Sequence, residues 1–170
     1  MTATTAESRK GGEWLTDWDP ENAETWNSSL AWKTMWVTTG ALTLAFCTWF
    51  LASAIAPNLT NLGFKLDKGQ LYWLAAMPGL AGGTLRLVWM WLPPIMGTRK
   101  LVALTTLLLL IPLVGWGIAV QNPSTSFVTF MILAALSGIG GGAFSGFMPS
   151  TSYFFPRSKQ GTALGLQAGL

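Results

Sequence analysis

A single charge lies in the apolar stretch "GLAGGTLRLVWMWLPP", residues 79–94, and it belongs to Arg86. No acidic residue follows Asp67 in the sequence, so this guanidinium has no nearby carboxylate along the chain. A charge near the centre of a bilayer costs about 2.5–3.5 kcal/mol on insertion scales, and such side chains are usually kept for a function. Arg86 is therefore the first candidate for a binding residue.

Three glycines precede Arg86 on the same side of a predicted helix. Gly79, Gly82 and Gly83 lie seven, four and three residues earlier, and they predict an open space over which the side chain extends. A long cation above this glycine floor, with no carboxylate nearby, favours a site for an anion from solution. Two alternatives stay open: a structural arginine bonded to carbonyls of another helix, and an arginine that snorkels towards the headgroups.

A second small-residue surface lies in "LAALSGIGGGAFSGF", residues 133–147. Its row of small residues at a spacing of four predicts close packing between two helices, and this is the simpler interpretation. The row consists of Ala134, Gly138, Gly142 and Gly146. Gly140 and Gly141 widen the small surface, and Phe144 lies one helical turn further on. A glycine backbone beside an aromatic ring is an alternative site for a flat ligand.

The elements that must position these residues are membrane helices. The chain is 51% hydrophobic and only 10% charged, whereas soluble domains carry about 25% charged residues. Uncharged apolar stretches predict an all-α membrane protein with spans at about 34–56, 69–95, 101–120 and 126–155, and the start of a fifth span at 162. Pro149 is expected to bend the fourth span. We therefore expect the transmembrane helical domain to occupy residues 31–170 and to be the N-terminal part of a longer bundle.

Residues 1–30 form a polar tail that holds six of the seven acidic residues. Its tryptophans, Trp14, Trp18 and Trp26, are expected either to pack on the helix ends or to belong to a mostly disordered segment. Lysine and arginine favour the cytoplasmic side of membrane proteins. Seven of them fall on one side of the predicted spans, and only Lys65 and Lys68 fall on the other. The bias predicts a multi-pass protein of the cytoplasmic (inner) membrane, with a cytoplasmic N-terminus.

Several function classes lack the residues that they need. The sequence has no histidine, and its one cysteine, Cys47, lies inside the first span, where we expect a small apolar core residue. We therefore expect no metal site, no cofactor and no enzymatic activity. The net charge of +3 comes from short basic clusters between apolar runs, so the lipid bilayer is the expected partner and nucleic acid is not.

The sequence resembles the nitrate/nitrite porters of NarK type, in the major facilitator superfamily. The resemblance runs through "TDWDPE", "LAFCTWFLASAIAPNLTNLGF", "QLYWLAAMPGLAGGTLR" and "GTRK". Its most specific part is "GIGGGAFSGFMPSTSYFFPRSKQGTALGLQAGL". The family's frequent asparagine is replaced here by Ala143, and the loop after the second span, residues 97–100, lacks the superfamily's acidic residue.

The resemblance implies an alternating-access transporter with two six-helix halves, of which this chain would hold the first four spans and the start of a fifth. It implies that Arg86 binds the substrate anion together with an arginine of the C-terminal half, and that Gly141 and Phe144 lie beside the anion. A guanidinium offers planar paired donors that match two oxygens of nitrate or nitrite. We expect nitrate/nitrite antiport or nitrate/proton symport. A transporter of another small anion and a non-transporting membrane scaffold subunit remain as alternatives.

Overall fold

The computed structural model of the chain describes residues 18–169, and all of its regular structure in that range is helical. This confirms the all-α class. The elements are α1 Ser28–Ile55, the short 3-10 helix η2 Ala56–Asn58, α2 Lys68–Trp89, α3 Leu92–Ala119, α4 Phe127–Ser137, α5 Ile139–Phe154 and α6 Arg157–Gly169.

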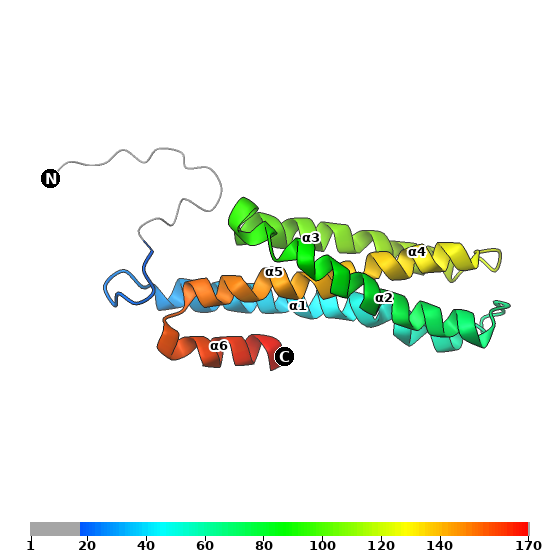
Figure 1. The fold of residues 1–170 in the computed structure, drawn as a ribbon, viewed down its shortest axis with the longest axis horizontal. Coiled ribbons are helices and arrows are strands. Elements are labelled where there is room, and N and C mark those ends of the chain that lie inside the picture. The colour runs from blue at the N-terminus through cyan, green and yellow to red at the C-terminus, as the bar shows by residue number, and fades with distance from the viewer. Residues whose placement is uncertain (1–17, 170) are drawn as a thin grey trace.

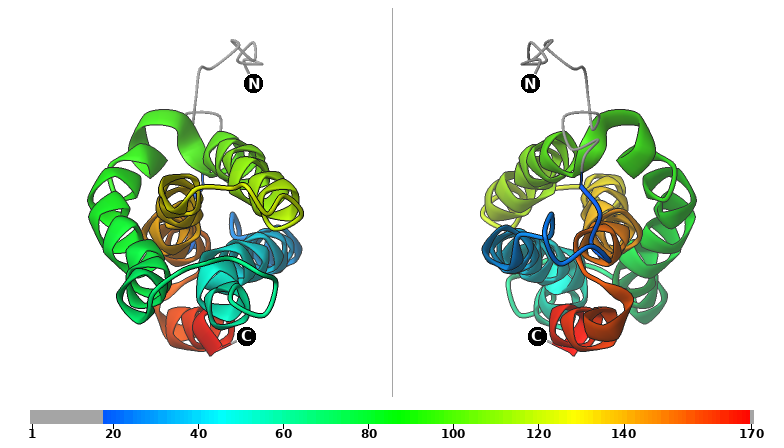
Figure 2. Two further views of the ribbon diagram at one scale, coloured as in Figure 1. Left: turned by 90° about the vertical axis from the view of Figure 1, so that its right-hand side faces the viewer. Right: turned by 90° about the vertical axis from the view of Figure 1, so that its left-hand side faces the viewer.

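The helices run along a common direction and form an elongated bundle (Figure 1). Seen along this direction, α5 lies inside the bundle, with α1, α2, α3 and α6 around it (Figure 2). Most of the residues of α5 between Ile139 and Ala143 are glycine, and all five are buried. Small residues let helix backbones approach closely, so the glycine-rich sequence explains why α5 is the central helix.

Polar side chains fix where three of the helices begin. Asn27 caps α1 by accepting from the backbone N–H of Leu30, and Asp67 and Gln70 form a reciprocal capping box at α2. Ser126 caps α4 through the backbone N–H of Thr129. These side chains satisfy N–H groups that have no partner inside the helix, so each marks a helix start that the local sequence encodes.

The second predicted span ends earlier than residue 95. Helix α2 stops at Trp89, Met90 and Trp91 form a turn, and a new helical segment begins at Leu92. Pro93 and Pro94, which have no N–H to donate, suit the first turn of a helix better than its interior. The chain breaks again at Gly97, which has a φ of 74°. The connection between the second and third spans therefore consists of the turn at residues 90–91, a short helical segment from Leu92 and the break at Gly97, rather than only "GTRK".

The fourth predicted span is interrupted at a glycine and not at its proline. Gly138 separates α4 from α5, and its N–H bonds the carbonyl of Ala135, which tightens the helix locally. A Cβ on Gly138 would lie 2.6 Å from that of Ala81 in α2, so the close approach of the two helices requires glycine. Helix α5 continues through Pro149 to Phe154.

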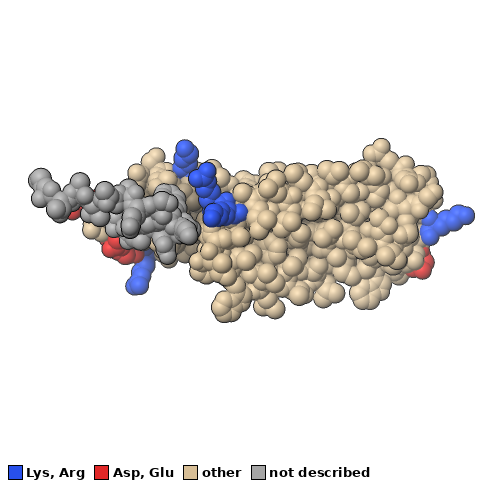
Figure 3. All heavy atoms as spheres, turned by 90° about the horizontal axis from the view of Figure 1, so that it is seen from above, with Lys and Arg blue, Asp and Glu red and all other residues tan. Residues whose placement is uncertain are grey.

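Three helical segments within residues 18–169 are long and apolar enough to cross a membrane: Ser28–Asn58, Leu92–Ala119 and Phe127–Phe154. Helix α2 is not one of them, because glycines, Lys68 and Arg86 lower its hydropathy. Its 22 residues still give a length of about 33 Å. In the view of Figure 3 the charged side chains lie towards the two ends, and the long side between them shows no Lys, Arg, Asp or Glu.

We expected Cys47 to lie in the core, but the structure places it on the surface. It is exposed on α1, because the buried side of this helix carries Leu42, Ala45, Thr48 and Ala52. Cys47 falls on the opposite side, which the helical spacing of these four residues determines. Helix α1 is apolar on all sides, so its sequence did not reveal this orientation.

Two of the three tail tryptophans pack on the end of the bundle. Trp18 lies edge-on to Phe154, with ring centroids 5.4 Å apart. The Nε1 of Trp26 donates to the carbonyl of Phe154 at 3.0 Å. This confirms the packing interpretation for Trp18 and Trp26, whereas Trp14 lies outside the described residues.

The same segment also contacts the beginning of α6. The carboxylate of Glu21 accepts from the backbone N–H of Arg157, the first residue of α6, at 2.8 Å. The ammonium of Lys159 lies 4.4 Å from the ring centroid of Trp26. An acidic cap and a cation–π contact thus hold the α5–α6 junction against the segment that precedes α1.

Candidate functional site

Arg86 projects from α2 towards α5 and is half-buried. Its Nε donates to the carbonyl of Gly141 at 3.2 Å, and this is the one hydrogen bond that the Arg86 side chain makes within residues 18–169. The acidic residues of this range, Asp19, Glu21, Glu24 and Asp67, precede α1 or α2. One of the five guanidinium N–H donors is therefore engaged, and the pair of Nη groups keeps its donors for another acceptor.

Two aromatic rings flank the guanidinium. Its Cζ lies 5.4 Å from the ring centroid of Phe144 on α5 and 5.6 Å from that of Trp49 on α1. Both distances lie within the range of cation–π attraction. Phe46 completes the aromatic group, with its centroid 5.5 Å from Trp49 and 6.0 Å from Phe144. The structure thus brings Arg86, Gly141 and Phe144 together.

Sequence reasoning missed the contribution of α1 to this site. Phe46 and Trp49 are one helical turn apart in "FCTWF", but aromatic residues are common throughout this apolar chain. The signal that was present is their spacing of three, which places both rings on one side of α1. Nothing in the sequence indicated which neighbouring helix that side would meet.

Gly141 makes room for a tryptophan ring. A Cβ at this position would lie 2.7 Å from Cε2 of Trp49, so any larger residue would displace the ring. The resemblance places this glycine beside the anion. In the structure the Trp49 ring fills the space that a side chain at residue 141 would occupy, and the carbonyl of Gly141 accepts from Arg86.

The expected glycine floor beside Arg86 is only partly open. Gly82 is buried, and a Cβ there would lie 3.0 Å from Nε1 of Trp49 and 3.1 Å from the carbonyl of Gly138. Gly79 and Gly83 have no such neighbour within 4 Å. Trp49 therefore occupies part of the space that the spacing of the glycines had predicted for the arginine.

The small-residue row of the fourth span serves helix packing. Gly138 lies against Ala81 of α2, Gly142 against Leu85 of α2, and Gly146 against Leu101 of α3. The neighbouring Gly140 lies against the backbone of α1 at Ala45. This agrees with the simpler interpretation of the row.

A second aromatic cluster lies near the end of the bundle at which α3 ends and α4 begins. Trp116 stacks on Phe130 at 5.3 Å, and Phe64 lies edge-on to Phe130 at 5.1 Å. All three rings are buried. The Nε1 of Trp116 donates to the hydroxyl of Ser137, which donates in turn to the carbonyl of Leu133. This cluster holds no charged side chain.

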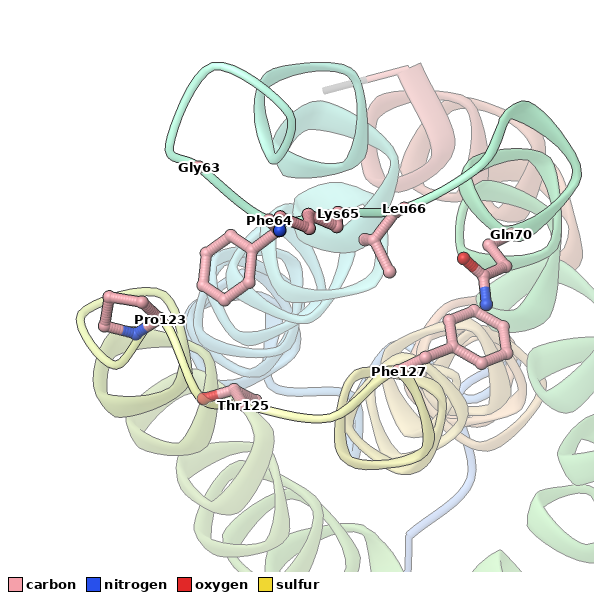
Figure 4. Close-up of a pocket in the computed structure, with 8 residues that line it drawn as sticks. All are labelled: Gly63, Phe64, Lys65, Leu66, Gln70, Pro123, Thr125 and Phe127. Carbon is pink, nitrogen blue, oxygen red and sulfur yellow. The ribbon is translucent and has the colours of Figure 1, made fainter.

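A pocket of about 320 Å³ opens beside this second cluster, between the loop before α2 and the loop before α4 (Figure 4). Its basic residue is Lys65, and Arg86 does not line it. The lining residues are Gly63, Phe64, Lys65, Leu66, Gln70, Pro123, Thr125 and Phe127. Within residues 18–169 no group of three or more His, Cys, Asp or Glu side chains could hold a metal ion.

The sequence model of the Major Facilitator Superfamily matches residues 38–170. The chain is 62% identical over 159 residues to the probable nitrate/nitrite antiporter NarK2 of Thermus thermophilus, an alignment that covers 94% of this chain and 36% of that protein. It is 43% identical over 159 residues to the nitrate/nitrite transporter NarU of Salmonella typhimurium, over 92% of this chain and 34% of that protein.

The corresponding values for the nitrate/nitrite transporter NarU of Escherichia coli are 42% identity over 92% of this chain and 34% of that protein. The chain thus spans about a third of the length of these relatives. They confirm the resemblance to nitrate/nitrite porters of NarK type. Because the family model matches most of its residues, the chain belongs to the Major Facilitator Superfamily.

Proposed function

We propose that this chain forms the N-terminal part of a secondary transporter that moves nitrate, nitrite or both across the cytoplasmic membrane. The observation that supports the proposal most directly is the hydrogen bonding of the Arg86 guanidinium. Its Nε is held by the carbonyl of Gly141, while its Nη groups make no hydrogen bond within the described residues. A cation with this arrangement, between two aromatic rings, suits a small singly charged anion.

The engaged Nε also defines how the anion would bind. A guanidinium can present one pair of parallel donors from Nε and Nη, and another from its two Nη groups. Since Nε already bonds Gly141, the Nη pair is the one available to two oxygens of nitrate or nitrite. Phe144 would then lie at the side of the guanidinium and limit the width of the anion site.

The proposed orientation in the membrane follows from the distribution of Lys and Arg, and the proposed C-terminal half follows from the family. Residues 31–170 would form the membrane domain, residues 1–30 would be cytoplasmic, and the basic residues would place the helix ends that carry them inside the cell. These residues are Arg9, Lys10, Lys33, Arg99, Lys100, Arg157 and Lys159. A C-terminal half of the same transporter would complete the anion site and support alternating access.

Flux measurements on the intact protein, purified into lipid vesicles, test this function. We expect nitrate uptake that is competed by nitrite. Acceleration by trapped nitrite would indicate antiport, and acceleration by an inward proton gradient would indicate symport. Uptake of bulkier anions without nitrate uptake would assign another substrate. Absence of any anion flux, with the protein inserted, would reject the transporter in favour of a membrane scaffold.

A further inference from the structure

Trp49 of α1 contacts the Arg86 site through a hydrogen bond to α2, a cation–π contact with Arg86 and close packing on glycines of α2 and α5. Its Nε1 donates to the carbonyl of Pro78 on α2 at 2.7 Å. One turn further along α1, the hydroxyl of Ser53 donates to the carbonyl of Ala75 at 3.0 Å. Two side chains of α1 thus donate to backbone carbonyls of α2 that lie one helical turn apart, at Ala75 and Pro78. These bonds fix α1 against the helix that carries Arg86.

The ring of Trp49 is held on its other sides by glycines. Cβ atoms built on Gly82 and Gly141 would approach Trp49 to 3.0 Å and 2.7 Å, and one on Gly140 would lie 3.1 Å from its Cβ. The ring therefore fills a space that α2 and α5 leave by lacking side chains. A ring packed in this way has little freedom to move.

The ring also lies beside the one anchor of Arg86. Gly141, whose carbonyl accepts from the Nε of Arg86, is the glycine that Trp49 covers. The guanidinium itself lies 5.6 Å from the ring centroid. A cation–π contact and a hydrogen bond both strengthen when water is excluded, and a bulky ring packed beside both leaves less room for water there.

We infer that Trp49 is a positioning residue that fixes the Arg86 guanidinium and thereby determines which anions its Nη groups accept. The identity of the anion in this inference rests on the proposed function. The part that concerns the positioning of Arg86 by Trp49 does not depend on that function. Removal of the ring would let the guanidinium rotate and would widen the site, so binding would weaken and selection for small planar anions would relax.

The test compares Trp49→Phe and Trp49→Leu with Trp116→Phe and Trp116→Leu in the intact protein. Trp116 is a matched control because it is also a tryptophan whose Nε1 donates a hydrogen bond, but its partners are Ser137 and Phe130. The first measurement is the rate at which phenylglyoxal modifies Arg86, read by mass spectrometry of the peptide. The exposed Arg99 serves as an internal reference in the same protein.

We expect Trp49→Leu to change the modification rate of Arg86 at least about threefold relative to Arg99, and Trp49→Phe to change it less. Both Trp116 variants should leave the ratio as in the wild type. Equal ratios in all five proteins would overturn the inference. An equal change in the Trp49 and Trp116 variants would also overturn it, since the effect would then be general loosening of the bundle.

The second measurement is the KM for nitrate uptake, together with the inhibition of that uptake by perchlorate. Perchlorate is tetrahedral and larger than nitrate. Trp49→Leu should raise KM about tenfold and lower the preference for nitrate over perchlorate, with a smaller change in kcat. A fall in kcat alone would contradict a positioning role. If the wild type moves no nitrate, the proposed function fails, and the modification rates still decide the role of Trp49.

Discussion

The bundle contains two aromatic clusters built from the same residue types. Around Arg86, Trp49 and Phe46 of α1 meet Phe144 of α5. Near the end of the bundle at which α3 ends and α4 begins, Trp116 of α3 meets Phe130 of α4 and Phe64 of the loop before α2. In both clusters a tryptophan ring is packed among apolar groups and its Nε1 donates to an oxygen.

The clusters differ in whether their polar groups are satisfied. In the Trp116 cluster the tryptophan N–H and the Ser137 hydroxyl each have a partner, and no charge is present. In the Arg86 cluster the cation uses its Nε donor, and its other donors make no hydrogen bond with any residue between 18 and 169. Packed rings with satisfied donors stabilise a fold, whereas packed rings around a cation with free donors suit the binding of an anion, which is the role that we propose for the Arg86 cluster. Residue types alone do not distinguish the two cases.

The largest expected effect comes from Arg86→Lys. The substitution keeps the charge but removes the paired Nη donors and the Nε bond to Gly141. We expect nitrate transport to fall by about 100-fold, the value for a lost bidentate charged contact. Uptake kinetics at equal membrane levels would measure it. Arg99→Lys, at an exposed site, is the control, and near-normal uptake by Arg86→Lys would reject planar recognition.

A smaller effect is expected from Gly141→Leu, because the new side chain would enter the space of the Trp49 ring. Such overpacking costs about 1–3 kcal/mol, and the displaced ring would disturb Arg86. We expect nitrate affinity to fall about tenfold while the protein still inserts. Gly117→Leu is the matched control, since Gly117 has open space around it. Unchanged affinity in Gly141→Leu would reduce this region to helix packing.

Phe144→Leu should have a moderate effect on binding. The substitution keeps an apolar group but removes the ring that lies 5.4 Å from the guanidinium. A lost cation–π contact predicts a rise in KM on the order of fivefold. Phe130→Leu makes the same change in the Trp116 cluster and should lower thermal stability without raising KM. A matching rise in KM in both variants would remove the distinction between the clusters.

The smallest effect is expected from Trp116→Phe. Ser137 keeps its bond to the carbonyl of Leu133, so the variant loses one hydrogen bond and a little packing. The cost to the free energy of unfolding should be about 1 kcal/mol. Thermal unfolding in detergent would measure it, alongside an unchanged KM for nitrate. A clear change in KM here would show that the second cluster also communicates with the anion site.

The sequence predicted those features that depend on local pattern. Apolar runs indicated the helical class, and Arg86 stood out because a charge in such a run is rare. The family resemblance added Gly141 and Phe144, which the structure places beside Arg86. Features that depend on two helices meeting were missed. Trp49 is one of many aromatic residues until α1 packs on α2. The turn at residues 90–91 falls inside a stretch, residues 69–95, for which hydropathy alone favoured one continuous helix.

The contacts made by the segment before α1 have a consequence for how the protein is synthesised. Trp26 bonds the carbonyl of Phe154, a partner 128 residues later in the chain. At ribosomal speeds of about 5–20 residues per second, roughly 6 to 25 seconds pass before that partner exists. Until then the tryptophan has no place to dock, and a protease can reach the segment. Protection of this segment in arrested nascent chains would therefore report the moment at which α5 joins α1.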